Sequence, residues 1–319
     1  MSQDTFLSVR GLTVEYVTKY ETVQAVNGVC LDLSKGQTLG LVGETGAGKT
    51  TIARAVTRIL QSPPAAVRGG EIFLDGVDLL KLPEREMCHM RGNRISMIFQ
   101  DPMTALNPVM CVGNQIAEVI RKHDHVSAAA ARQQAEMSLE LVGIPAQRYG
   151  EYPHQFSGGM KQRVVIAAAL ACGPDLLLAD EPTTALDVTI QAQMLDMMHR
   201  LHDLKETSTV IITHDMGVVA EMCDYVAVIY AGEIVEYGAL EDVFDHAAHP
   251  YTVGLFAAIP SMWEDVARLT PIPGQPPDPT ALPVGCKFSP RCAYMDGECG
   301  ARPVEMKTVG PGHTCRCLR

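Results

Sequence analysis

A glycine-rich stretch in the first sixth of the chain constrains the fold more than any other feature. The pattern is G-x-x-x-x-G-K-[ST], and its residues are Gly43, Glu44, Thr45, Gly46, Ala47, Gly48, Lys49, Thr50 and Thr51. The mostly apolar residues 37–42 before it predict a short strand. Residues 51–60 after it contain no glycine or proline and predict a helix. A strand, a glycine-rich loop and a helix in this order indicate a phosphate-binding loop.

The residue types of this loop suit a nucleoside triphosphate. Successive backbone N–H groups surround the phosphate chain, and the N-terminus of the helix adds positive potential. Glycine is needed where the backbone approaches the phosphates closely. We expect Lys49 to reach the β- and γ-phosphates and the Thr50 hydroxyl to bind Mg²⁺. The alternative is a glycine-rich turn that matches by chance, and the flanking strand and helix disfavour it.

A pair of acids follows a second apolar strand. The apolar residues 176–179 lead directly into Asp180 and Glu181. Asp180 can hold Mg²⁺ from its second side, and Glu181 can polarise a water for in-line attack on the γ-phosphate. Any buried strand can end in acids. The pair is informative because it follows a phosphate-binding loop on the same chain.

A hydroxyl and two glycines, those of Ser157, Gly158 and Gly159, open another predicted helix. Such a start is a second anion-binding helix N-terminus. One nucleotide does not need both N-termini, so this one is expected to serve the nucleotide of a neighbouring chain. The alternative is a plain helix cap followed by a glycine turn.

Composition narrows the class of protein. The chain has 319 residues, 47% hydrophobic and 20% charged, as expected of a globular protein with one large domain and an appendage or with two domains. Its net charge of −11 argues against a general nucleic-acid binder. No apolar run approaches the length that spans a bilayer, and residues 1–4 lack the form of a signal peptide. We therefore expect the chain to stay in the cytoplasm.

Strands alternate with helices along most of the chain, which predicts an α/β fold with a parallel-type sheet. The predicted strands span residues 7–9, 12–16, 71–74, 77–79, 95–99, 175–181, 209–213, 226–230 and 233–237. The predicted helices span residues 51–60, 112–122, 128–142, 160–172, 188–204 and 218–222. Residues 101–155 read as a helical insertion. Past about residue 240 the pattern dissolves, and the proline-rich residues 271–279 predict a stiff linker.

Together these segments resemble the ATP-binding-cassette family of transporter ATPases over about residues 6–240. The resemblance implies a P-loop NTPase cassette with a RecA-like core, an antiparallel β subdomain and a helical insertion. It also implies a role for each motif. Tyr16 would stack on adenine, residues 43–51 would form the Walker A loop, and Gln100 would sense Mg²⁺ and water. Asp180 and Glu181 would form Walker B, with Glu181 as the catalytic carboxylate, and His214 would contact the γ-phosphate. Two motifs would act across a dimer: Ser157, Gly158 and Gly159 clamp the partner's γ-phosphate, and Thr184-Ala185-Leu186-Asp187 couples the two sites.

The resemblance narrows to the importers of peptides and nickel. It is carried by residues 100–108, 152–160, 187–193 and 249–252, and by the tail from residue 271 to Cys315. We expect residues 1–240 to be the nucleotide-binding domain and residues 241–319 a C-terminal extension. Met160 departs from the glutamine that is common in signature motifs, but it is the form usual in one of the two ATPase subunits of these importers.

The implied partners follow from this subgroup. They are a second ATPase subunit forming a heterodimer, two membrane-spanning permeases contacted through the helical insertion, and an extracytoplasmic substrate-binding protein. The implied place is the cytoplasmic side of the cell membrane. The cargo stays open among dipeptides, oligopeptides and nickel chelates. One alternative is a cassette protein acting on DNA or ribosomes, but the sequence shows neither the basic surface nor the second cassette typical of those proteins. The other alternative is an exporter ATPase.

The ten cysteines fall into two groups. Those scattered singly are expected to be buried, inert thiols: Cys30, Cys88, Cys111, Cys172 and Cys223. In the tail, Cys286, Cys292, Cys299 and Cys315 form a C-x₅-C-x₆-C-x₁₅-C array. Zinc sites usually have tighter C-x₂₋₄-C pairs, so the wider gaps favour a [4Fe–4S] cluster, with zinc as the alternative. The family resemblance implies the same ligands, and Cys317 is expected to be a spare.

Overall fold

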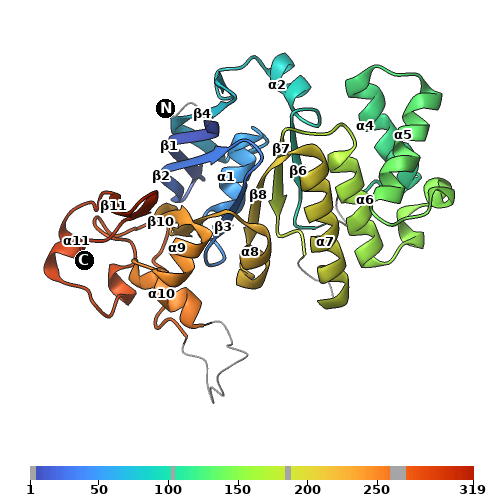
Figure 1. The fold of residues 1–319 in the computed structure, drawn as a ribbon. Coiled ribbons are helices and arrows are strands. Elements are labelled where there is room, and N and C mark those ends of the chain that lie inside the picture. The colour runs from blue at the N-terminus through green and yellow to red at the C-terminus, as the bar shows by residue number, and fades with distance from the viewer. Residues whose placement is uncertain (1–4, 102–104, 184–187, 259–270) are drawn as a thin grey trace. The chain divides into compact units, whose positions relative to one another are not determined.

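The computed structural model describes residues 5–101, 105–183, 188–258 and 271–319 (Figure 1). The chain divides into two compact units. The first consists of Met1–Ser34, Thr38–Leu80 and Thr213–Arg319, and the second of Lys35–Gln37 and Lys81–Ile212. The first unit therefore holds both the phosphate-binding loop and the C-terminal extension.

An antiparallel sheet forms one layer of the first unit. Its order is β2-β1-β4-β5, with β1 at Thr5–Val17, β2 at Thr22–Ser34, β4 at Ala65–Leu74 and β5 at Val77–Asp78. The two strands predicted over residues 7–16 are one strand, which passes through a register irregularity near Gly11. The β2 strand was not predicted, because Gly28 at φ 63° interrupts its alternation of buried and exposed residues. The predicted Asp75-Gly76 hairpin turn is confirmed, and both residues have positive φ.

The second sheet of this unit carries the phosphate-binding loop at the end of a buried strand. Its order is β11-β12-β10-β9-β3, with β3 at Thr38–Val42, β9 at Tyr225–Tyr230, β10 at Glu233–Ala239, β11 at Lys307–Gly310 and β12 at His313–Cys315. The β3 and β9 strands are parallel, and the other pairs are antiparallel. Helices α1 at Lys49–Val56 and α8 at Met216–Met222 also belong to this unit. The α1 helix is shorter than predicted, because Arg58 at φ 52° ends it.

The C-terminal extension is more regular than the sequence suggested. It contains α9 at Leu240–Asp245, α10 at Pro250–Ala257, η3 at Ser289–Arg291 and α11 at Gly297–Ala301, shown in orange and red in Figure 1. Its strand β12 pairs with β10, where Glu236 lies opposite Cys315. The extension thus continues a sheet of the cassette, which local patterning did not reveal since each of its elements is short.

The second unit contains the parallel strands β8-β7-β6 and most of the helices. The strands are β6 at Ile95–Ile98, β7 at Leu176–Asp180 and β8 at Ser208–Thr213, and β7 is buried throughout. The helices are α2 at Glu84–Met90, α4 at Val112–Asp124, α5 at Ala128–Leu141, η1 at Ala146–Gly150, η2 at Pro153–Gln155, α6 at Gly158–Leu170 and α7 at Val188–Lys205. The parallel sheet and the helical insertion are both confirmed.

Four of the five scattered cysteines correct the expectation of buried thiols. Cys223 is buried, but Cys111 and Cys172 are partly exposed, and Cys30 on β2 and Cys88 on α2 are exposed. Cys30 and Cys88 lie on the outward face of an element that is buried on its other side. In the described part of the chain, no helix combines the length and the apolar character needed to cross a membrane.

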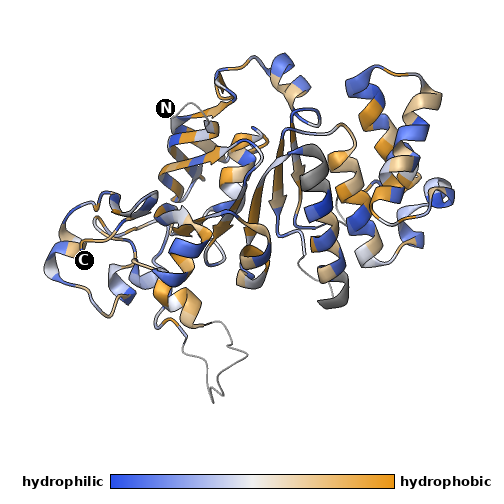
Figure 2. Cartoon of the chain, in the orientation of Figure 1, coloured by the Kyte–Doolittle hydropathy of each residue, from blue (hydrophilic) through white to orange (hydrophobic). Residues whose placement is uncertain are grey.

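The helical insertion packs through two amphipathic helices. Figure 2 shows hydrophilic and hydrophobic residues alternating around α4 and α5. The buried side of α4 includes Ile116 and Ile120, and that of α5 includes Ala131, Ala135 and Leu139. Gly113 at the start of α4 lies against Tyr149 of η1, where an added Cβ would come within 2.1 Å of a ring carbon. The ring therefore requires a residue without a side chain at position 113.

We predict that Gly113→Ala destabilises the insertion, because its methyl group displaces the ring of Tyr149. The displaced ring also loses the hydrogen bond from its hydroxyl to Asn114 Oδ1 at 2.9 Å. The expected loss is about 1–3 kcal/mol in the free energy of unfolding, measured by urea denaturation. Gly150→Ala is the matched control, since a Cβ there meets no atom within 4 Å. Equal stability of the two variants would contradict the prediction.

Candidate functional site

The phosphate-binding loop approaches neighbouring backbone too closely for side chains at two of its positions. A Cβ at Gly43 would lie 2.2 Å from the carbonyl oxygen of Ile229, and one at Gly48 would lie 2.3 Å from that of Ala25. Gly48 also has φ 105°, the left-handed side that favours glycine. These two glycines bring the loop against β9 and β2, and the chain then enters α1. The predicted geometry of strand, loop and helix is confirmed.

Lys49 is folded back onto its own loop. The residue is 6% exposed, and its Nζ donates to the carbonyl oxygens of Gly43 at 2.6 Å and Glu44 at 3.0 Å. A buried ammonium held by backbone oxygens lies within the loop that the motif assigns to phosphates. Its charge is thus available to a phosphate chain bound there.

Tyr16 contacts Thr51, the last residue of the loop motif. It lies near the end of β1, is half-buried, and its hydroxyl is 3.1 Å from Thr51 Oγ1. Two residues assigned to one site from the sequence are therefore in contact. The stacking of the Tyr16 ring on adenine stays a prediction.

In the second unit, the two acids and Gln100 lie together at the end of the parallel strands. Asp180 is 2% exposed and is the last residue of β7. Glu181 follows in the left-handed region at φ 48°, and its N–H donates to the carbonyl oxygen of Ile212 at 2.8 Å. Gln100 Nε2 donates to Glu181 Oε2 at 2.8 Å. A non-glycine residue in this strained conformation is typical of functional sites.

Ser157 caps α6, which begins where a helix was predicted. Its Oγ accepts a hydrogen bond from the N–H of Met160 at 3.4 Å. Ser157 and Gly158 are exposed, and a Cβ at Gly158 meets nothing within 4 Å. The start of α6 is therefore open to another molecule.

Gln162, to which no role was assigned from the sequence, links this helix to the segment after the acids. It lies on α6 and is 1% exposed, and its Nε2 donates to the carbonyl oxygen of Pro182. A glutamine inside a helix carries no sequence signal for such a contact. Only the packing of α6 beside the segment after β7 shows it.

Three further predictions concern His214 and two segments of the chain. His214 is exposed and follows β8 directly. The proposed coupling loop Thr184-Ala185-Leu186-Asp187 lies outside the described residues, as do residues 102–104 of the importer-like segment. Tyr16, the loop and His214 belong to the first unit, whereas Gln100, the start of α6 and the two acids belong to the second.

The tail cysteines gather around a small cavity, with one change from the predicted set. Its lining includes Cys286, Cys292, Cys299 and Cys317 but not Cys315. Cys315 is buried on β12, opposite Glu236. Among the described residues, no three His, Cys, Asp or Glu side chains are gathered closely enough to hold a metal ion.

A buried histidine also lines this cavity. His249 is fully buried, and its Nδ1 accepts a hydrogen bond from the N–H of Tyr251 at 3.0 Å. Burial, and then the nearby charge of Arg316, lowers the pKa of His249 to about 4. The ring is therefore neutral at pH 7, and its proton lies on Nε2 because Nδ1 is an acceptor. That Nε2 has no hydrogen-bond partner among the described residues.

Comparison with known proteins agrees with this geometry. The ABC transporter family matches residues 26–184, and the family "Oligopeptide/dipeptide transporter, C-terminal region" matches residues 235–299. The oligopeptide transport ATP-binding protein OppD of Bacillus subtilis is 51% identical over 90% of this chain and 81% of its own length. The dipeptide transport ATP-binding protein DppD of the same organism is 48% identical over 97% and 91%.

Solved structures share the fold at low sequence identity. A dimeric ATP-binding cassette in a post-hydrolysis state bound to ADP and phosphate has a TM-score of 0.67 at 24% identity, covering 73% of this chain and 98% of its own. A cassette of the CbiONQ transporter complex from Clostridium perfringens has a TM-score of 0.65 at 23% identity, covering 79% and 96%. The predicted cassette fold is thus confirmed. The chain belongs to the ATP-binding subunits of ABC transporters, within the oligopeptide/dipeptide importer family.

We predict that Lys49→Ala loses most of the affinity for MgATP, because phosphate charge then meets only backbone dipoles. Equilibrium binding of a fluorescent ATP analogue measures the loss, which should be at least tenfold. Lys19→Ala removes an exposed lysine from the turn between β1 and β2 and is the control. An unchanged affinity of the Lys49 variant would show that the nucleotide does not bind at this loop.

Proposed function

We propose that this chain hydrolyses ATP to power the uptake of peptides through an ABC importer. In this proposal the loop at residues 43–51 holds the triphosphate, Thr50, Gln100 and Asp180 hold Mg²⁺, and His214 contacts the γ-phosphate. When bound, Mg²⁺ neutralises phosphate charge. The observation that carries the proposal is the contact between Gln100 and Glu181 at the end of the buried strands.

Glu181 is the general base in this proposal. Its carboxylate takes a proton from the water that attacks the γ-phosphate in line, so that ADP leaves as the phosphate forms. The amide of Gln100 donates to one carboxylate oxygen and so helps to orient the carboxylate. The left-handed backbone at Glu181 fixes the direction of this side chain.

The exposed start of α6 supports a dimer in which each chain completes the other's site. Ser157, Gly158 and Gly159 are proposed to clamp the γ-phosphate bound by a second ATPase subunit, forming a heterodimer. Two permeases dock on the helical insertion at about residues 101–155, and an extracytoplasmic protein delivers the cargo. The chain then lies on the cytoplasmic side of the cell membrane as a peripheral subunit.

Peptides are the cargo that the relatives favour. The similar proteins are named for oligopeptide and dipeptide transport, and the C-terminal family carries the same description. Nickel or a metal chelate is the second candidate, because the same importer-like segments suit both. Measured uptake of labelled peptide against labelled nickel by the reconstituted complex separates the two cargoes.

We predict that Glu181→Gln in the reconstituted importer binds MgATP but hydrolyses it at least a hundredfold more slowly, and stops peptide uptake. Glu140→Gln, an exposed glutamate on α5 of the same unit, is the control. Phosphate release and uptake are measured in the same vesicles. Near-normal turnover by the Glu181 variant would show that another group is the base.

The cysteine cavity supports a [4Fe–4S] cluster as a second proposal, with Cys286, Cys292, Cys299 and Cys317 as ligands. All four line one cavity, whereas Cys315 does not. The unpartnered Nε2–H of buried His249 suits a sulfur acceptor there. Zinc held by the same thiolates is the alternative. When bound, such a cluster would cross-link the tail.

We predict that anaerobically purified protein is brown and contains about four irons per chain, from the cluster stoichiometry. Cys317→Ser should lose the iron and the visible absorption, and Cys315→Ser should keep both. Cys30→Ser is the control, because Cys30 is an exposed cysteine far from the tail in the sequence. Loss of iron on changing Cys315 but not Cys317 would restore the set predicted from the sequence, and zinc without iron would exclude the cluster.

A further inference from the structure

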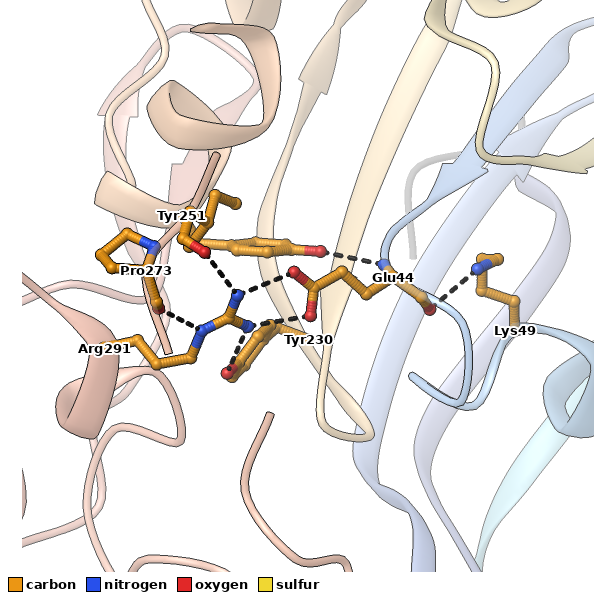
Figure 3. A network of polar contacts seen from close by, with 7 residues as sticks. Glu44, Lys49, Tyr230, Tyr251, Pro273 and Arg291 are labelled. Carbon is orange, nitrogen blue, oxygen red and sulfur yellow. Dashed lines mark hydrogen bonds and ion pairs between the residues drawn. The ribbon is translucent and has the colours of Figure 1, made fainter. Parts of the chain in front are cut away.

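The first variable residue of the phosphate-binding loop is held from the C-terminal extension. The Glu44 N–H donates to the Tyr251 hydroxyl at 2.9 Å, and its carboxylate accepts from Arg291 Nη1 at 2.8 Å and Nη2 at 3.0 Å (Figure 3). Its carbonyl oxygen accepts from Lys49 Nζ at 3.0 Å. Backbone and side chain of this one residue are therefore both fixed. Two of its three partners belong to residues 241–319.

The guanidinium of Arg291 is positioned by contacts of its own. Besides the two bonds to Glu44, its nitrogens donate to the carbonyl oxygens of Pro273 at 2.9 Å and Ile272 at 3.4 Å and to the Tyr230 hydroxyl at 3.1 Å. All five of its donors are thus used. In Figure 3, Arg291 and Glu44 point toward one another while Lys49 lies beyond Glu44.

Burial separates this ion pair from ordinary surface pairs. The Arg291 side chain is 5% exposed and that of Glu44 is 28% exposed. Exposed pairs contribute little, but loss of one partner of a buried pair leaves an uncompensated charge. The extension's Arg302 and Glu298 illustrate the exposed kind, at 64% and 71%.

The position of the carboxylate gives the pair a consequence for ligand binding. Glu44 is part of a loop that must accept a polyanion, and an unneutralised carboxylate there repels phosphate. The bidentate guanidinium cancels that charge and directs the carboxylate toward the extension. The same contact fixes the residue whose carbonyl oxygen holds Lys49.

We propose that Arg291 is a positioning residue of the ATP site, through which the C-terminal extension sets the affinity of the phosphate-binding loop for MgATP. The proposal rests on the proposed function only in that this loop binds ATP. Arg291 precedes Cys292 directly, so the folding of the cysteine-rich tail determines whether the guanidinium is in place. The extension is then part of the nucleotide site as well as an appendage to it.

The test is equilibrium binding of fluorescent MgATP to the full-length chain. We expect Arg291→Gln to bind about tenfold more weakly, as the loss of one directly coupled partner predicts. Arg291→Lys keeps the charge with fewer donors and should fall between this variant and the wild type. The double variant Arg291→Gln/Glu44→Gln should recover most of the loss, because it removes the uncompensated carboxylate.

Lys287→Gln is the matched control. Lys287 also ties the extension to the cassette, with its Nζ 3.7 Å from Glu233, and both side chains are largely buried. Lys287 bonds to the carbonyl oxygen of Pro283 and pairs with Glu233, and neither partner belongs to the loop. Binding should therefore change less than twofold, while thermal unfolding reports any lost stability.

Three outcomes would overturn the inference. They are wild-type affinity in Arg291→Gln, equal weakening in Arg291→Gln and Lys287→Gln, and a double variant no better than Arg291→Gln. Lys49→Ala separates the inference from the proposed function. If the wild type binds MgATP and Lys49→Ala does not, the ATP site stands whatever the Arg291 variants do.

Discussion

The structure of the first unit depends on how closely one loop can approach its neighbours. A loop that turns backbone N–H groups toward a polyphosphate must be held from outside, since its own hydrogen-bonding groups face the ligand. Gly43 lies against β9 and Gly48 against β2. The carbonyl oxygen of Ala47 accepts from the N–H of Gly232, at the turn between β9 and β10. The antiparallel sheet, the mixed sheet and the extension are therefore all needed to fix the loop.

Strain has a comparable role at the acids of the second unit. Asp180 ends a buried parallel strand, and the next residue leaves the strand with positive φ. Such a conformation costs on the order of 1–3 kcal/mol and persists only where surrounding contacts determine it. Here those contacts include the N–H of Glu181 on Ile212 and the amide of Gln162 on Pro182. The backbone contacts of the strands thus fix where the Glu181 side chain begins and in which direction it leaves the backbone.

The sequence predicted those parts of the fold that have strong local patterns. The loop at residues 43–51, the helix α5 and the β9–β10 hairpin follow from glycine spacing, helical composition and turn residues. The long strand β2 was missed because a glycine bulge breaks its period. Spacing could not show that Cys317 rather than Cys315 lines the tail cavity, because that depends on β12 ending at Cys315. The contact between Gln100 and Glu181 joins residues far apart in sequence, and only the family resemblance had assigned Gln100 to the same site as Glu181.

The extension looked separable from the cassette in the sequence, and one buried carboxylate shows why it is not. Glu236 of β10 is fully buried and accepts from the N–H groups of Ala248 at 2.7 Å and His249 at 2.9 Å. It also lies 2.8 Å from Nε2 of His313 on β12. Each of these partners belongs to the extension.

Removing residues 241–319 would therefore leave a carboxylate of the cassette sheet without its hydrogen bonds. It would also remove both Tyr251 and Arg291 from Glu44. Loss of partners around a buried carboxylate costs several kcal/mol, of the order of the stability of a whole domain. A truncated chain would thus report unfolding together with any effect on the nucleotide site. Point substitutions that leave Glu236 and its partners intact separate unfolding from an effect on the nucleotide site. They change the contact with the loop, while β12 stays paired with β10.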